Sequence, residues 1–111
     1  MINIKPDVRA ALETVCDNVV FYFPKTFKNL PCISYYEINN APSVFADDGE
    51  YTADILYTVD VWDKGSDGVS ALALLADGAL AAAGFMREFA ADVYNPDSSV
   101  RHKTMRFKLI I

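Results

Sequence analysis

The sequence is poor in the residues that build metal centres and catalytic triads. It has one histidine, His102, and two cysteines, Cys16 and Cys32, among 111 residues, and no CxxC motif. A structural zinc site needs four such ligands, usually at short spacings, so no metal centre is predicted. Two isolated cysteines are typical of buried, reduced thiols. We therefore expect no metal and no cofactor.

Long apolar runs and phosphate-binding loops are also missing. The longest apolar stretch, residues 69–85, is interrupted by Asp77 and contains glycines, so no membrane span is predicted. The N-terminal MINIKPDVRAALE lacks the apolar core of a signal peptide. No Gly-rich phosphate loop is present, because the GSDG that begins at Gly65 is a turn.

Positive charge is scarce as well. The net charge is −5 and the pI is near 4.6, which argues against general nucleic-acid binding through a basic surface. The chain is 52% hydrophobic, enough for one core. We expect a single domain over residues 1–111.

The most regular pattern in the chain is YTADILYTVDVWD, residues 51–63. Apolar and polar residues alternate here for twelve positions, as in a half-buried β-strand. At roughly 3.3 Å per residue the strand would be about 40 Å long, beyond the usual limit of about ten residues. We infer that part of it contacts another chain. One face is expected to lie under helices and the other to face a neighbouring subunit, with Tyr51, Ile55, Tyr57, Val59 and Val61 on the first and Asp54, Asp60 and Trp62 on the second.

Periodicity and turn residues predict the remaining elements. The expected segments are a helix from Pro6 to about residue 20, strand 32–38, a loop at 39–50, strand 51–63, a helix from Ser66 or Asp67 to Gly84, strand 85–94 and a closing strand at 100–111. The order α-β-β-α-β-β predicts an α+β fold. We expect a mainly antiparallel four-stranded sheet with two helices packed on one face.

Two oppositely charged segments stand out. The loop at 39–50 combines apolar Val44 and Phe45 with an acidic group, and the closing strand is basic. These charged side chains can simply lie on solvated faces, or they can form cross-strand pairs that stabilise the fold by about 0.2–1 kcal/mol each. They can also be complementary surfaces that fix a head-to-tail contact between subunits, or the basic strand can face DNA. The acidic residues are Asp47, Asp48 and Glu50, and the basic ones are Arg101, His102, Lys103, Arg106 and Lys108.

No catalytic constellation is predicted. Asp54 and Asp60 share one face of the long strand, but six residues separate them by about 20 Å, too far for paired catalytic carboxylates. Cys16 and His102 are better explained as an inert core thiol and an exposed strand histidine than as a thiol–imidazole pair. We therefore do not expect an enzyme.

The sequences of several segments, and the order in which they follow one another, resemble the tail-completion proteins of long-tailed phages and prophages. These include tail terminators and tail-to-head joining proteins. The similarity runs from about Pro31 to the C-terminus. It is carried by FADDGEYTADILYTVDVW, by the alanine-rich helix ending in GF with MRE after it, and by the closing RHKTMRFK.

This resemblance implies a subunit of a hexameric ring at the head-proximal end of the tail tube. Such a ring ends tube growth and docks the head connector; it has no cofactor and lies in the virion after assembly in the host bacterial cytoplasm. The implied partners are further copies of the chain, the tail-tube protein and a head connector or neck protein, with DNA only in passage and no membrane. The inferred interface comprises Val44, Phe45, Asp47, Asp48, Glu50, Asp54, Asp60, Trp62, Arg101, His102, Lys103, Arg106 and Lys108.

A second hypothesis from another class is a small cytosolic, dimeric ligand-binding or regulatory domain. In that case the aromatic residues Phe21, Tyr36 and Phe45 would line a pocket. Phe21, Phe23 and Phe27 can equally fill the seam between helix and sheet, or form a patch for a neighbouring subunit.

Replacement of Cys16 by alanine or serine should lower stability without changing assembly, because an inert buried thiol contributes packing only. Thermal unfolding and a particle-assembly assay measure the two effects separately. Loss of assembly at unchanged stability would contradict the inert-thiol interpretation.

Overall fold

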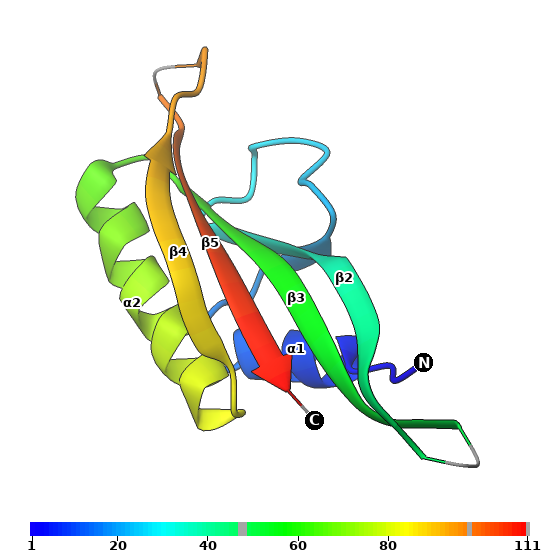
Figure 1. Ribbon diagram of the computed structural model, residues 1–111. Helices are drawn as coiled ribbons and strands as arrows, with labels where there is room; N and C mark the ends of the chain where they lie inside the picture. Colours follow the sequence, from blue (N-terminus) through cyan, green and yellow to red (C-terminus); the bar gives the residue numbers. More distant parts are fainter. Residues whose placement is uncertain (47–48, 98, 111) are drawn as a thin grey trace.

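The computed structural model describes residues 1–46, 49–97 and 99–110. Two helices and five strands form two layers, with both helices behind the sheet in Figure 1. In chain order the elements are α1 (Lys5–Glu13), β1 (Val19–Phe21), β2 (Cys32–Ala46), β3 (Gly49–Asp63), α2 (Ser66–Ala82), β4 (Met86–Val93) and β5 (Arg101–Ile110).

The sheet has the strand order β1-β2-β3-β5-β4. All neighbouring strands are antiparallel except β1, which runs parallel to β2 with Val19 opposite Ile33. The α+β class is confirmed, but the prediction of four antiparallel strands is wrong, because the sheet is five-stranded and mixed. The first helix ends at Glu13 instead of near residue 20, and this frees three β-branched and aromatic residues to pair as β1.

The alternating strand at the centre of the sheet is confirmed. Ile55, Tyr57, Val59 and Val61 are fully buried, and they share one hydrophobic core with residues of both helices. β3 pairs with β2 on one side and with β5 on the other. Its 15 residues correspond to about 50 Å of extended chain, which accounts for the 53 Å long axis of the molecule.

The prediction of a loop at residues 39–50 is wrong. β2 continues through Ala46 and β3 begins at Gly49, so most of the segment belongs to a long antiparallel hairpin. Register shifts after Glu37 and after Pro42 interrupt the alternation of side chains along β2. Together with the turn-forming residues, these irregularities hide the strand pattern in the sequence. Asp47 and Asp48 lie outside the described residues.

An irregularity also changes the faces of β4. A register shift between Arg87 and Phe89 separates Phe85, which is buried in the core, from Phe89 and Val93, which are exposed. Simple alternation along residues 85–94 predicts that Phe85, Phe89, Ala91 and Val93 share one face, and this prediction is wrong. Ala90 packs against the core instead, and Phe89 lies opposite Arg106 on the helix-free face of the sheet.

The prediction that Gly84 ends α2 is confirmed. Gly84 has φ +97, and the N–H groups of Gly84 and Phe85 donate to the carbonyls of Ala81 and Leu80, which is the Schellman arrangement. At the other end the helix begins after Gly65 without a side-chain cap, so the predicted cap at Ser66 or Asp67 is wrong.

Gly84→Ala should destabilise the protein by about 1–2 kcal/mol, because an L side chain is strained at positive φ. Gly78→Ala is the matched control. Gly78 is exposed within the helix and a methyl group there would meet nothing within 4 Å. Gly78→Ala should stabilise by about 0.5–1 kcal/mol. Urea unfolding of both variants checks the opposite signs; equal effects would contradict this account.

Candidate functional site

The even-numbered side chains of β3 and β5 lie together on the helix-free face of the sheet. The register places Trp62 opposite His102, Asp60 opposite Thr104, and Asp54 opposite Ile110. Six of the predicted interface residues therefore belong to one surface: Asp54, Asp60, Trp62, His102, Arg106 and Lys108. Asp60 and Trp62 are only 2% and 7% exposed, so these two side chains are enclosed within the subunit.

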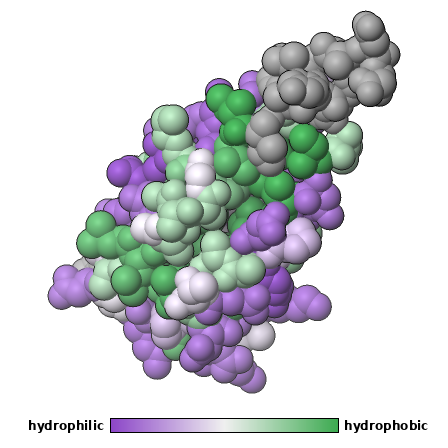
Figure 2. All heavy atoms as spheres, turned by 90° about the horizontal axis from the view of Figure 1, so that it is seen from below, coloured by the Kyte–Doolittle hydropathy of each residue, from purple (hydrophilic) through white to green (hydrophobic). Residues whose placement is uncertain are grey.

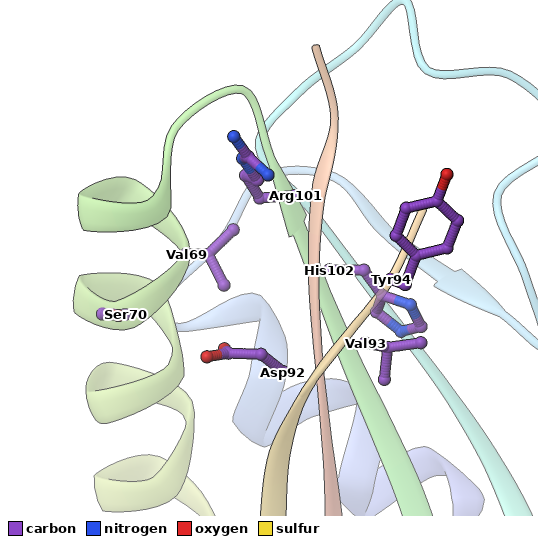
Figure 3. Close-up of a pocket in the computed structure, with 7 residues that line it drawn as sticks. All are labelled: Val69, Ser70, Asp92, Val93, Tyr94, Arg101 and His102. Atoms are coloured by element: carbon purple, nitrogen blue, oxygen red, sulfur yellow. The ribbon is translucent and has the colours of Figure 1, made fainter. Parts of the chain in front are cut away.

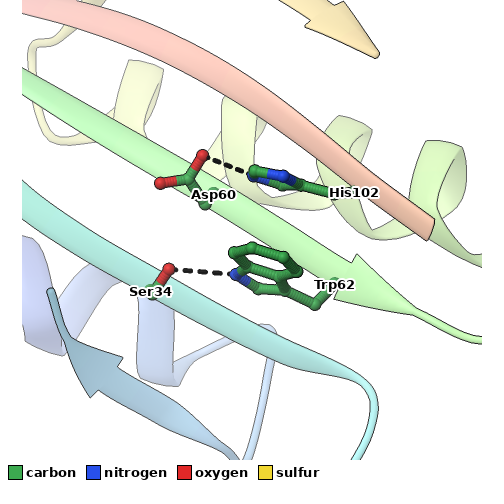
Figure 4. A network of polar contacts seen from close by, with 4 residues as sticks. All are labelled: Ser34, Asp60, Trp62 and His102. Atoms are coloured by element: carbon green, nitrogen blue, oxygen red, sulfur yellow. Dashed lines mark hydrogen bonds and ion pairs between the residues drawn. The ribbon is translucent and has the colours of Figure 1, made fainter. Parts of the chain in front are cut away.

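Asp60 and Trp62 belong to a compact polar network (Figure 4). The indole N–H of Trp62 donates to Ser34 Oγ at 3.0 Å, and His102 Nε2 lies 2.7 Å from Asp60 Oδ1. The rings of Trp62 and His102 are stacked, with centroids 3.7 Å apart and planes 11° from parallel. The network joins β2, β3 and β5. The expectation of an exposed strand histidine is wrong, since the His102 side chain is 10% exposed.

Aromatic residues of the connection between β1 and β2 cover this network. The rings of Phe27 and Phe23 lie 5.3 Å and 6.2 Å from that of Trp62. Trp62 also packs with Cys32 and Val100 in a second, smaller hydrophobic core. The network therefore holds the β1–β2 connection against the sheet, and its first role is structural.

Several charges of β5 are already engaged within the chain. Lys103 Nζ lies 3.5 Å from Asp92 Oδ1 on β4, and the guanidinium of Arg106 lies 5.9 Å from the centre of the Phe89 ring. Lys108 is half-buried and pairs with Leu56 across the sheet. Arg101 is exposed at the start of the strand. The basic strand thus contributes fewer free charges than its sequence indicates.

A cavity of about 300 Å³ lies where α2, β4 and β5 meet (Figure 3). A serine, a histidine and an aspartate line it, which raises the question of a triad. His102 Nε2 contacts Asp60, however, and Ser70 has no hydrogen bond to His102 in the described chain. The serine, histidine and aspartate that line the cavity therefore do not form a hydrogen-bonded triad in the described chain. The lining residues are Val69, Ser70, Asp92, Val93, Tyr94, Arg101 and His102.

The hairpin of β2 and β3 projects beyond the rest of the sheet (Figure 1). Among the described residues, the pairing of β5 with β3 ends at Asp54 and Ile110, so residues 42–46 and 49–53 pair only with each other. An isolated two-stranded ribbon is at best marginally stable in water. The predicted interface residues Val44, Phe45 and Glu50 belong to this ribbon, and Asp54 lies at its base with a half-buried side chain.

Both cysteines are buried, free thiols. Burial raises the pKa of Cys32 to about 11 and also raises the pKa of Cys16, whose thiol lies 3.5 Å from the carbonyl oxygen of Asn18. A thiol with a raised pKa is a poor nucleophile at neutral pH. No group of three or more His, Cys, Asp or Glu side chains is placed to hold a metal ion within the described residues. No described helix is both long and apolar enough to cross a membrane.

The sequence matches the family described as "Tail completion protein gp17" over residues 5–111. The chain belongs to this tail completion family. A comparison with curated protein sequences finds no match. A similar solved chain comes from a structure described as "Virion of native gene transfer agent (GTA) particle". The TM-score is 0.64 at 17% identity, over 91% of this chain and 81% of that one, and this likeness shows the shared fold.

Membership of the tail completion family confirms the resemblance found in the sequence. The match begins at residue 5 and so includes α1 and β1, whereas the sequence resemblance was expected to start near Pro31. The protein is accordingly a structural component of a phage tail, located in the tail or neck of the virion.

Sequence reasoning did not find Ser34 as the partner of Trp62. The clue is weak but present: Ser34 stands in a segment that is mostly apolar on both faces, CISYYEI. A buried indole N–H requires an acceptor, and a serine on a neighbouring strand can supply one. The register between β2 and β3 is needed to bring the two together.

Ser34→Ala should destabilise this tail completion protein by about 1–3 kcal/mol, because the buried indole N–H of Trp62 loses its acceptor. Ser70→Ala, on the exposed side of α2, should change the free energy of unfolding by less than about 0.5 kcal/mol. Urea unfolding followed by tryptophan fluorescence measures both variants. An effect of Ser34→Ala as small as that of the control would mean that the bond contributes nothing.

Proposed function

We propose that six copies of this protein form a ring at the head-proximal end of the tail, where the ring ends tube growth and joins the tail to the head connector. The observation that carries the proposal is the two-stranded ribbon, residues 42–46 and 49–53, which has no third strand beside it in the part of the chain that the structure describes. A ribbon of this kind gains stability when another chain packs against it. Its length is explained by assembly and not by the subunit's own core.

The outer face of α2 supports burial in an assembly. Leu74 and Leu75 are 73% and 56% exposed. The charged residues of the helix are Asp67 in its first turn and Asp77, which pairs with Arg87. An exposed helix face with mainly apolar side chains favours contact with a partner. The outward residues are Asp67, Ser70, Ala71, Leu74, Leu75, Gly78, Ala81 and Ala82.

Hydrophobic surface also gathers at the end of the molecule from which the hairpin projects. Figure 2 shows a band of it across the middle of this end, bordered by polar side chains. Met86 and Ile110, at the ends of β4 and β5, are 68% and 62% exposed. Exposed apolar patches on a small protein mark interaction sites.

The proposed partners are further copies of the chain, the tail-tube protein and a head connector or neck protein, with DNA only passing through the ring. The similar solved chain belongs to a virion particle, which agrees with this placement. Val44, Phe45, Asp47, Asp48 and Glu50 on the hairpin and Arg101, Arg106 and Lys108 on β5 are the proposed contact residues. Asp60, Trp62, His102 and Lys103 act indirectly, by holding the sheet and the β1–β2 connection. The role needs neither catalysis nor a cofactor.

Asp47→Lys/Asp48→Lys should lower the yield of joined, infectious particles by about a hundredfold or more, because misplaced like charges at an interface cost several kcal/mol. The thermal stability of the free subunit should stay unchanged. In the assay, the variant gene is supplied to a phage from which the gene has been deleted. Electron microscopy then counts tailed particles, and the titre gives the number of infectious ones.

Glu13→Lys/Asp17→Lys makes the same charge change at exposed positions near the end of α1, where positive charge is tolerated. It should assemble normally. Normal particles from the Asp47/Asp48 variant would remove the hairpin tip from the interface.

A further inference from the structure

The last residue of β1 and the connection between β1 and β2 present an exposed aromatic surface. Phe21, Tyr22, Phe23 and Phe27 are 48%, 56%, 46% and 36% exposed, although each contacts another ring. Exposed aromatic side chains this close together are unusual on a free subunit and are enriched at interfaces. We call residues 21–28 the aromatic platform.

Specific hydrogen bonds and ring contacts hold the aromatic platform in one conformation. Tyr22 has φ +76, a strained conformation for an aromatic residue, yet its N–H donates to the Tyr35 carbonyl at 2.9 Å and its ring stacks on Tyr36 with centroids 5.1 Å apart. The side-chain amide of Asn18 donates to the carbonyl of Asn29 at 2.6 Å and closes the base of the connection. Strain maintained by surrounding contacts clusters at functional sites.

The chemistry of the platform is apolar and positive. A cavity of about 260 Å³ opens within it, and Lys25 is one of its lining residues. Lys25 and Lys28 are exposed and have no ion pair in the described part of the chain. No acidic residue occurs between Asp17 and Glu37. The cavity is lined by Asn18, Val20, Phe21, Phe23, Pro24, Lys25, Thr26 and Asn29.

We propose that the aromatic platform of one subunit receives the hairpin segment 44–50, VFADDGE, of a second copy. The segment supplies apolar Val44 and Phe45 for the cavity and three carboxylates for the two lysines. This contact rests on the proposed ring and specifies how neighbouring copies join. It also assigns the positive side of the contact to the β1–β2 connection instead of to β5, whose Lys103 and His102 already have acidic partners.

The same subunit cannot make this contact with itself. The platform adjoins the Cys32 end of β2 and the hairpin segment lies at the Ala46 end, and the 14 residues between them span about 45 Å of strand. Figure 1 shows the connection near one end of β2 and the described part of the hairpin at the other. Contacts of this kind are head-to-tail and heterologous.

Trp62 provides a built-in reporter, because it is the only tryptophan and the rings of Phe23 and Phe27 contact it. A disulfide-closed peptide of residues 40–52, with one cysteine added at each end, should produce a saturable change in the tryptophan fluorescence of the full-length protein. Binding should be about tenfold weaker for Lys25→Glu/Lys28→Glu, which loses two exposed charge pairs, and unchanged for the control Lys64→Glu. No saturable change, or equal binding by both variants, would overturn the proposal.

A charge exchange tests the contact in assembled particles. Lys25→Asp/Lys28→Asp and Asp47→Lys/Asp48→Lys should each block assembly, and combining all four changes in one chain should restore most of it. Failure of the combined variant, with its thermal unfolding unchanged, would overturn the contact. A fluorescence change produced by the tube protein in place of the hairpin peptide would also overturn it.

The two proposals can fail separately. Peptide binding without any ring on tail tips would refute the ring and leave the platform contact standing. Rings from Lys25→Glu/Lys28→Glu as abundant as those from the wild type would refute the platform contact and leave the ring standing.

Discussion

Burial of one face of β3 under the two helices is the interaction on which the fold depends. Ile55, Tyr57, Val59 and Val61 each lie at alternate positions and are all fully buried. A shift of one residue in the register would exchange them for Asp54, Thr58 and Asp60. The alternation therefore fixes the partners on both sides of β3 and the position of the helices over it. Burying Tyr57 in this layer also raises the pKa of its hydroxyl, mainly by desolvation.

The other face of the sheet is stabilised differently. Helices do not cover it, and its buried end depends on the Trp62–His102 stack and on hydrogen bonds to Ser34 and Asp60. Polar groups in a buried network specify one arrangement only when their partners are in place. The aromatic platform is attached to this network, so the shape of an exposed surface depends on a buried cluster beneath it.

The sequence was informative where one local rule acts over many residues. The alternation of β3 and the glycine at the end of α2 needed no knowledge of distant contacts. β1 was missed because three residues are too few to show a period, and the long β2 was missed because register shifts after Glu37 and Pro42 interrupt its alternation. The pairing of Asp60 with His102 joins residues 42 positions apart, and only the register of β3 with β5 reveals it. The exposure of the platform rings could not be predicted either, because the same residues could have filled the core.

The register shifts in β2 have a consequence for the geometry of an assembly. Bulges bend a strand and increase its local twist, so they set the direction in which the hairpin leaves the sheet. In the proposed ring, that direction fixes the rotation from one subunit to the next, and the rotation decides whether the chain of contacts closes and after how many copies. Copy number would then be encoded in backbone curvature near residues 37–44, in addition to the charges of the contact itself. Related chains with the same contact residues but different bulges would build rings of different diameter.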